Sequence, residues 1–403
     1  QPGDTSAMCR TGKGKLGGII FRCGDAAAIF LLAHGCVRFG SAAPVERRPM
    51  TGKPRKVLLL DGIGGIPLGR DLCDAFSKLG VATAYLDCLS QERRPLHGIR
   101  AAYAKALNRQ SDRDGFSLLP KLVEKDLEAL LERESPSHIL VVGFAYRFYD
   151  PAFLRRLADK LGAVLLLYDT DSCNLYSRRR EFIYFVENEL PVYDLIFSFS
   201  KVTTRFFRES RKLNAVFLPF GAKPPSALPQ AEKALDVLFV GTCDLRRIFV
   251  IEGIRDHVTI YGNRWQRNFP LMSDALRSRI TDKTVWGDEL LELMGKSKIL
   301  LNITRSDFFG AETGVNLRIF EALAAGCFLL TDHCEELAEL FAVGKEIETY
   351  RSSAELAEKA GYYLNNKDAR LAIARNGHAA FLAAHTWQAR IEQLLMPALD
   401  LPQ

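Results

Sequence analysis

The sequence predicts an α/β fold in which two parallel β-sheets follow one another along the chain, each with helices on both faces. Short apolar runs alternate with amphipathic stretches, an order typical of strands and helices in a parallel sheet. Most of the runs are apolar at every position, as strands buried on both faces are. A proline-rich break at residues 219–225 interrupts the alternation, which restarts at residue 235. We therefore expect two Rossmann-like halves.

The first half is expected to begin with the apolar run at residues 57–60, which ends in a glycine-containing turn and leads into an amphipathic helix. Gly80 closes that helix, since glycine is a common stop signal. We expect strands at residues 57–60, 81–86, 138–142, 163–168, 195–198 and 215–218, and helices at 70–79, 119–133, 151–160, 180–189 and 203–211. These elements place an N-terminal domain at residues 50–222.

The second half follows a stretch at residues 223–234 that is rich in proline, serine and alanine and is expected to be a linker. We expect strands at residues 235–240, 258–261, 299–303 and 327–331, and helices at 289–296, 315–325, 354–364, 367–384 and 386–395. The C-terminal domain should therefore cover residues 235–384, with a last helical segment at 385–403.

The charge of the chain argues against a nucleic-acid partner. The 403 residues carry a formal charge of +6, but residues 1–56 hold ten Lys/Arg against three acids, and the rest holds 44 basic against 45 acidic side chains. The body is thus close to neutral, without the basic excess that nucleic-acid binding needs. Nine cysteines are scattered without metal-binding spacing, which indicates reduced thiols and a cytoplasmic protein.

Residues 1–49 are expected to be a leader or upstream extension outside the folded core. Met50 precedes the first strand, where a chain of this class commonly begins. Arg22 and Asp25 interrupt the apolar run at residues 17–37, and the part that remains is too short to span a bilayer. The alternative is a membrane-associating or targeting leader. We therefore expect no transmembrane segment, while peripheral membrane contact remains open.

Ligands of open parallel sheets bind at the carboxyl ends of the strands, so the residues just past each strand are the site candidates. In the first half, Gly62, Gly64 and Gly65 follow the first strand. Glycines here leave room for an acceptor substrate to approach the backbone. The same glycines loosely resemble a dinucleotide-binding turn, with Asp87 where a ribose-binding acid would lie, so an NAD-dependent enzyme or a nucleotide-sugar epimerase remains an alternative.

The second half carries the sharper pattern. Gly241 is followed by Arg246 and Arg247 at the start of a helix, and a helix N-terminus with arginine suits phosphate oxygens. The helix after Gly314 places Asn316 at its start, and its Arg318 and Glu321, three residues apart, can share one side.

These residues resemble the GT-B glycosyltransferases, and most closely their CgeB-like, spore-maturation branch. The resemblance covers about residues 235–397 and rests on five pieces: Asp236-Val237-Leu238-Phe239-Val240-Gly241 with Arg246-Arg247; Ile260-Tyr261-Gly262; Ile299-Leu300-Leu301-Asn302-Ile303; Asn316-Leu317-Arg318-Ile319-Phe320-Glu321-Ala322; and His385-Thr386-Trp387 with Arg390. It implies two Rossmann-like domains facing across a cleft, with the helix at residues 385–403 crossing back to the first domain.

The resemblance also implies roles for individual residues. Glu321 would hold the ribose of a nucleotide-diphosphate sugar, and Arg318, Arg246 and Arg247 would offset the charge of the diphosphate. The donor-binding residues are then Gly241, Arg246, Arg247, Tyr261, Gly262, Asn316, Arg318 and Glu321. No metal and no other cofactor are expected, although Asp169-x-Asp171 has a chelating form.

The catalytic residue is less well defined. The fuller pattern of the family has a second glutamate eight residues before Glu321, where this chain has Thr313, so retention or inversion of the anomeric configuration stays open. A base for inversion would come from the first half, and Asp169 and Asp171 are the predicted catalytic residues. Tyr146 is an alternative base and, with Gly62, Gly64 and Gly65, a predicted acceptor contact.

The predicted function is therefore transfer of a sugar from a nucleotide-diphosphate donor to an acceptor that is a protein, a glycan or a small molecule. Two alternatives remain: another enzyme class on the same architecture, and a non-catalytic assembly protein that keeps the fold.

Overall fold

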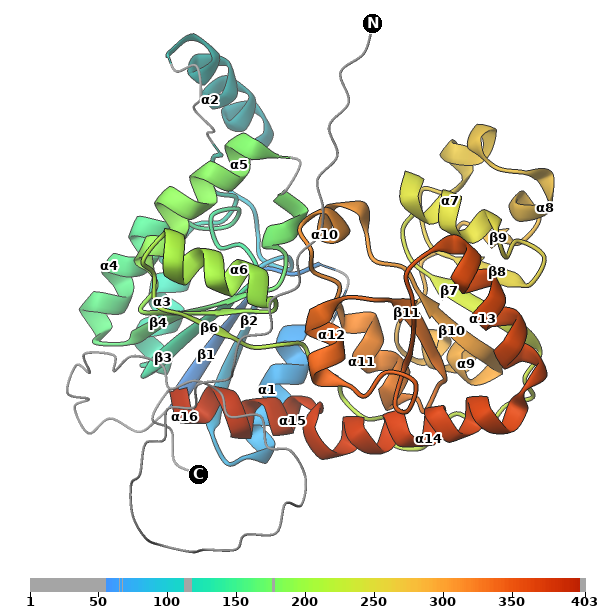
Figure 1. Cartoon of the computed structure of the whole chain (residues 1–403). Coiled ribbons are helices and arrows are strands. Elements are labelled where there is room, and N and C mark those ends of the chain that lie inside the picture. Colours follow the sequence, from blue (N-terminus) through green and yellow to red (C-terminus); the bar gives the residue numbers. More distant parts are fainter. Residues whose placement is uncertain (1–55, 65, 67, 112–117, 176–177, 399–403) are drawn as a thin grey trace, which may run out of the picture. The chain divides into compact units, whose positions relative to one another are not determined.

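The computed structural model describes residues 56–398, except residues 65, 67, 112–117 and 176–177. The predictions for residues 1–49 and for Gly65 lie outside this part of the chain. The described part contains two six-stranded parallel sheets (Figure 1). This confirms the predicted α/β class with two Rossmann-like halves.

The first sheet has the strand order β2-β1-β3-β4-β5-β6. Its strands are β1 (Lys56–Asp61), β2 (Ala82–Asp87), β3 (His138–Val142), β4 (Val164–Asp169), β5 (Leu195–Ser198) and β6 (Ala215–Phe217). Helices cover both faces because successive side chains of a strand point in opposite directions. Leu59 packs in one core with α1, whereas Leu58 packs in another with α3.

The helices of the first half connect these strands. They are α1 (Leu68–Lys78), α2 (His97–Ser111), α3 (Glu124–Glu134), α4 (Pro151–Leu161), η1 (Ser172–Leu175), α5 (Arg179–Tyr184), η2 (Phe185–Glu189), η3 (Leu190–Val192), α6 (Lys201–Arg205) and η4 (Phe206–Ser210). Helix α4 shows how the sequence sets both ends: the side chain of Asp150 caps its first turn, and Gly162 ends it in the left-handed conformation.

The second sheet has the order β12-β11-β10-β7-β8-β9. Its strands are β7 (Leu235–Val240), β8 (Val258–Tyr261), β9 (Ile280–Thr281), β10 (Ser297–Asn302), β11 (Leu329–Asp332) and β12 (Glu348–Tyr350). The short edge strands β9 and β12 were not predicted, because two or three residues leave almost no periodic signal.

The helices of the second half pack around this sheet. They are α7 (Leu245–Glu252), η5 (Gln266–Leu271), α8 (Asp274–Arg277), α9 (Gly287–Lys296), α10 (Ser306–Gly310), α11 (Leu317–Ala324), α12 (Glu335–Leu340), α13 (Ser353–Asn365) and α14 (Lys367–Ala384). Helix α11 buries Ile319, Phe320 and Leu323. Because this side of α11 is buried, only the polar residues on its other side can face a ligand.

The end of the chain lies against the first half. Helix α15 (Trp387–Arg390), with η6 (Ile391–Leu395) and α16 (Met396–Ala398) after it, contacts α1. Trp387 donates its backbone N–H to Ala222 and meets the ring of Tyr168 edge-on at 6.2 Å. The C-terminal segment therefore packs on the first half through a backbone hydrogen bond and an aromatic contact.

Several helices differ from prediction, and the short helices α8, α10 and α12 were not predicted. The helix expected from residue 119 begins at Glu124, because residues 121–122 pair instead with residues 93–94 and 147–148. Helix α2 was not predicted at all. No helix in the described part of the chain is long and apolar enough to cross a membrane.

Candidate functional site

A pocket of about 400 Å³ is lined by residues that follow the strands of both sheets. From the first half it takes the loops after β1 and β4, and from the second half the loops after β7, β8 and β10 and the start of α11. This is the edge at which parallel sheets bind ligands. Its volume falls within the usual range for small-molecule sites.

The loops after β7 and β8 line the pocket with backbone. A Cβ atom on Gly262 would lie 1.9 Å from the carbonyl oxygen of Gly241, so only glycine permits this approach of the two strand ends. Trp265 donates its indole N–H to the same carbonyl at 2.9 Å. Both predicted glycines, Gly241 and Gly262, thus line the pocket, whereas Tyr261 does not.

Arg247 and Arg305 bring positive charge to the pocket. Arg247 is 8% exposed and donates to the carbonyls of Ile303 and Thr242. Its nearest ion-pair partner is Asp244, 3.9 Å away. Burial lowers the pKa of Arg247 to about 10, with a further lowering from the charge of Arg305. The guanidinium of Arg247 therefore remains positive at neutral pH and is repelled by that of Arg305.

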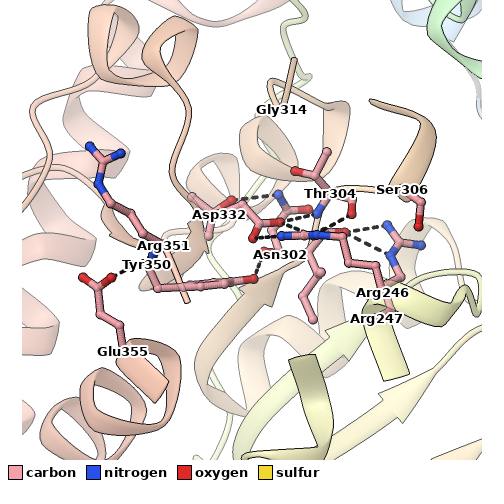
Figure 2. A network of polar contacts seen from close by, with 12 residues as sticks. Arg246, Arg247, Asn302, Thr304, Ser306, Gly314, Asp332, Tyr350, Arg351 and Glu355 are labelled. Carbon is pink, nitrogen blue, oxygen red and sulfur yellow. Dashed lines mark hydrogen bonds and ion pairs between the residues drawn. The ribbon is translucent and has the colours of Figure 1, made fainter. Parts of the chain in front are cut away.

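The surroundings of Arg246 are not those expected of an arginine that binds a phosphate group. Its guanidinium makes two hydrogen bonds to the carboxylate of Asp332, at 2.6 and 2.9 Å (Figure 2). It also lies over the ring of Phe309, 3.8 Å from the centroid. Arg246 does not line the pocket. Its charge is therefore neutralised within the protein, and we assign it a structural role.

The ion pair of Arg246 belongs to a network that holds the end of β10 (Figure 2). Asp332 accepts the backbone N–H of Thr304 at 2.7 Å, and Arg246 donates to the carbonyl of Thr304 at 3.0 Å. Tyr350 donates its hydroxyl to the carbonyl of Asn302. The network thus fixes Thr304, a pocket residue whose buried hydroxyl has no hydrogen-bond partner among the described residues.

Helix α11 supplies three of the predicted donor residues. Asn316 caps it by accepting the N–H of Arg318 at 3.1 Å. Arg318 donates to Glu321 at 2.7 Å, and all three side chains line the pocket. Burial raises the pKa of Glu321, while the charge of Arg318 opposes that rise. Glu321 therefore offers a partly desolvated carboxylate to hydroxyl donors.

The two predicted catalytic aspartates lie in different surroundings. Asp169 is 1% exposed and accepts from the backbone and hydroxyl of Ser172 and the hydroxyl of Ser198. It holds the loop after β4 and does not line the pocket. Asp171 does line it, and burial raises the pKa of Asp171 to about 6. Only Asp171 is therefore placed to meet a substrate.

The predicted acceptor residues separate in the same way. Gly64 lines the pocket, whereas Gly62 packs beneath the ring of Phe148 and does not. Tyr146 is 1% exposed and donates its hydroxyl to Glu181. Tyr146 therefore braces the first half and does not reach the pocket.

Thr170, Thr304 and Arg305 also line the pocket. They were predicted only as members of the loops just past the strands, at residues 169–171 and 304–307, without a role of their own. All three lie one to three residues after a strand, at β4 or β10, so their place at the carboxyl edge was the available signal. The hydroxyl of Thr170, like that of Thr304, is buried without a hydrogen-bond partner among the described residues. Two threonines with unpartnered buried hydroxyls and two arginines thus contribute to the same pocket.

If Arg246 is structural, its removal should reduce stability. Arg246→Ala leaves Asp332 buried without its partner, and breaking such pairs costs about 3 kcal/mol. Urea denaturation should show this loss in the free energy of unfolding. In contrast, Lys283→Ala removes an ion pair whose side chains are 59% and 46% exposed and should cost less than about 1 kcal/mol. Equal, small effects of both variants would contradict the assignment.

Comparisons with known proteins agree with this architecture. Residues 245–396 match the family model described as glycosyl transferase-like. Anabaena HepE, solved with UDP and glucose, has a TM-score of 0.56 at 14% identity, over 86% of this chain and 100% of that one. Sucrose-phosphate synthase from Thermosynechococcus elongatus has a TM-score of 0.56 at 13% identity, over 86% and 99%.

A glycosyltransferase from Rickettsia africae has a TM-score of 0.52 at 11% identity, over 86% and 98% of the two chains. No curated protein matches the sequence. At these identities the solved structures establish the fold, which is GT-B, and the family match concerns residues 245–396. Together, the GT-B architecture and the glycosyl transferase-like match support a glycosyltransferase, the enzyme class that the sequence predicts.

Proposed function

We propose that the chain transfers a sugar from a nucleoside diphosphate sugar to a hydroxyl group of an acceptor, and that it belongs to the CgeB-like branch. The donor would bind to the second half, between the loop after β7 and helix α11. The acceptor would approach from the loops after β1 and β4. A structural neighbour, Anabaena HepE, has been solved with UDP-glucose, which favours a nucleotide-sugar donor here.

The observation that carries this proposal is the pair of guanidiniums in the pocket. Arg305 makes no ion pair with any described residue and donates only to Asn174, at 3.1 Å, while Arg247 is bonded to backbone carbonyls. Two positive charges that repel each other beside a pocket are stabilised by an anion with more than one charge. A diphosphate meets this requirement, and arginine binds its oxygens in a favourable geometry.

The neighbouring hydroxyls suit the same ligand. Thr304 and Thr170 each leave a buried hydroxyl unpartnered in the described structure, which costs free energy unless a ligand accepts or donates there. Both line the pocket with the two arginines. Phosphate and sugar oxygens would satisfy them.

The nucleoside would lie beside Glu321. A carboxylate can accept hydrogen bonds from two adjacent ribose hydroxyls, and the burial that raises the pKa of Glu321 makes such donors favourable. Trp286 lines the same part of the pocket, with its ring centroid 6.0 Å from the guanidinium of Arg318. Its aromatic ring offers a surface against which a base could stack.

The chemistry follows from the charges. As the bond between the sugar and the diphosphate breaks, negative charge grows on the leaving phosphate, and Arg247 and Arg305 would stabilise that charge. We propose that these two guanidiniums supply the electrostatic stabilisation and that no metal is required. Asp171 would accept the proton of the attacking acceptor hydroxyl, since a pKa of about 6 suits a general base near neutral pH.

Replacing Glu321 tests the donor site. Glu321→Ala should weaken binding of the preferred nucleotide, among UDP, GDP and TDP, by roughly 10–100-fold, because hydrogen bonds to a charged group are lost. Isothermal titration calorimetry measures this affinity directly. The matched control is Glu292→Ala on helix α9, where Glu292 pairs with Lys296 at the surface, and it should bind as the unmodified chain does.

Normal nucleotide affinity in a folded Glu321→Ala variant would refute this donor site. Stabilisation of the chain by NAD, but by none of the three nucleotides, would instead favour an oxidoreductase.

Asp171 should appear in the pH dependence of the reaction. A base must be deprotonated to accept a proton, so kcat should fall as the pH drops below about 6, the raised pKa of Asp171. Asp171→Asn should reduce kcat by at least about 100-fold and leave donor affinity nearly unchanged. Steady-state rates of nucleotide release from pH 5 to pH 8 check both. A variant that keeps its rate would exclude Asp171 as the base.

A further inference from the structure

Helix α2 exposes an apolar stripe that has no place in the site described above. Leu96, just before the helix, is 72% exposed, and Ile99, Tyr103 and Leu107 are 69%, 67% and 48% exposed. The spacing of three or four residues puts these four side chains on one side of the helix. An amphipathic helix normally turns such a face to the core, so this one is unpartnered in the described structure.

The stripe is exposed because α2 is held to the first half at its N-terminal end. The chain before it is tied to residues 119–122: Arg94 donates to the carbonyls of Lys121 and Leu122, and a ring nitrogen of His97 lies 3.0 Å from the carbonyl oxygen of Leu119. Within the helix, none of the residues whose side chains are described is buried. Figure 1 shows α2 standing away from the first sheet.

Basic residues predominate along the stripe, although Glu92 and Asp112 flank it in the sequence and Arg94 pairs with Glu124 at 3.1 Å. Residues 93–111 contain five Lys/Arg and no acidic residue. Among them, Arg93, Arg100 and Lys105 are exposed, and Arg100 follows Ile99 at the border of the stripe. Apolar side chains flanked by basic ones complement a surface that is apolar beneath and negatively charged at its boundary, as an anionic lipid layer is.

The size of the face also favours lipid over protein. A helix of 15 residues is roughly 22 Å long and about 10 Å wide, so its footprint is roughly 220 Å². A stable protein interface needs about 800 Å² from each partner. Lipid binding needs no such matching surface, because apolar side chains enter a fluid layer one by one.

We propose that α2 docks the protein on an anionic lipid surface. Ile99, Tyr103 and Leu107 enter the boundary between head groups and acyl chains, while Arg100 and Lys105 contact lipid phosphates. This inference goes beyond the proposed transfer reaction and does not depend on it. If both hold, the acceptor side of the enzyme, which carries α2, works at the membrane surface.

Co-sedimentation of the full chain with lipid vesicles tests this proposal. The chain should bind vesicles of phosphatidylcholine mixed with phosphatidylglycerol, and should bind vesicles of phosphatidylcholine alone at least about tenfold more weakly. The triple variant Ile99→Ser, Tyr103→Ser, Leu107→Ser should lose about tenfold or more of the binding to anionic vesicles. Arg100→Glu with Lys105→Glu should lose a similar amount.

The matched control is Leu245→Ser with Phe249→Ser on helix α7, two exposed apolar residues in the second half. It should bind anionic vesicles as the unmodified chain does. Circular dichroism and nucleotide affinity, both unchanged in the triple variant, establish that the fold and the pocket are intact. They also separate a failure here from a failure of the proposed reaction.

Three results would overturn the proposal. The first is no binding of the unmodified chain to anionic vesicles, and the second is full binding of the triple variant, which would place the contact elsewhere, such as in residues 1–48. The third is equal binding to neutral and anionic vesicles. Loss of self-association in the triple variant, without any vesicle binding, would show that the stripe joins two copies of the chain instead.

Discussion

Much of the pocket depends on one buried cation, the guanidinium of Arg247. It lies at the start of α7 and donates to the carbonyls of Ile303, after β10, and Thr242, after β7. It thereby joins the ends of two neighbouring strands. Because backbone carbonyls surround this group and its nearest carboxylate, Asp244, lies 3.9 Å away, its charge is only partly offset and reaches the pocket. A cation held in this way is costly unless an anion arrives, which couples the folded site to its ligand.

The adjacent arginine has the opposite role. Arg246 is neutralised by Asp332 and uses that ion pair to hold Thr304. The same network therefore positions the loop that carries Thr304 and Arg305 at the edge of the pocket. Arg246 holds the loop that lines the pocket, whereas Arg247 supplies positive charge to the pocket. This division explains why the two residues, although consecutive, are not interchangeable.

The sequence predicted the layers of the fold well because parallel strands buried on both faces are apolar at every position. Leu58 and Leu59 of β1 pack into two different cores, as expected for a strand covered on both faces. It also predicted Glu321 as a pocket residue, because the apolar spacing of α11 determines which side faces the core. Among the elements that were missed are two short edge strands and helix α2, none of which carries a periodic buried face.

The distinctions that the sequence could not make concern neighbouring polar residues. Arg246 and Arg247 differ by a rotation of about 100° around the helix, and their partners come from strands distant in sequence. Asp169 and Asp171 lie two residues apart, yet only the former ends a strand and is enclosed by Ser172 and Ser198. Such contacts are set by the assembled sheet and are not encoded in local spacing.

The central claim is that Arg247 and Arg305 form a site for a diphosphate. Calorimetric affinities for the nucleoside, its monophosphate and its diphosphate, with the base the chain prefers, test it most directly. We expect the diphosphate to bind at least about tenfold more tightly than the monophosphate. This difference in affinity should disappear in Arg305→Ala. Equal affinity for all three compounds would contradict it.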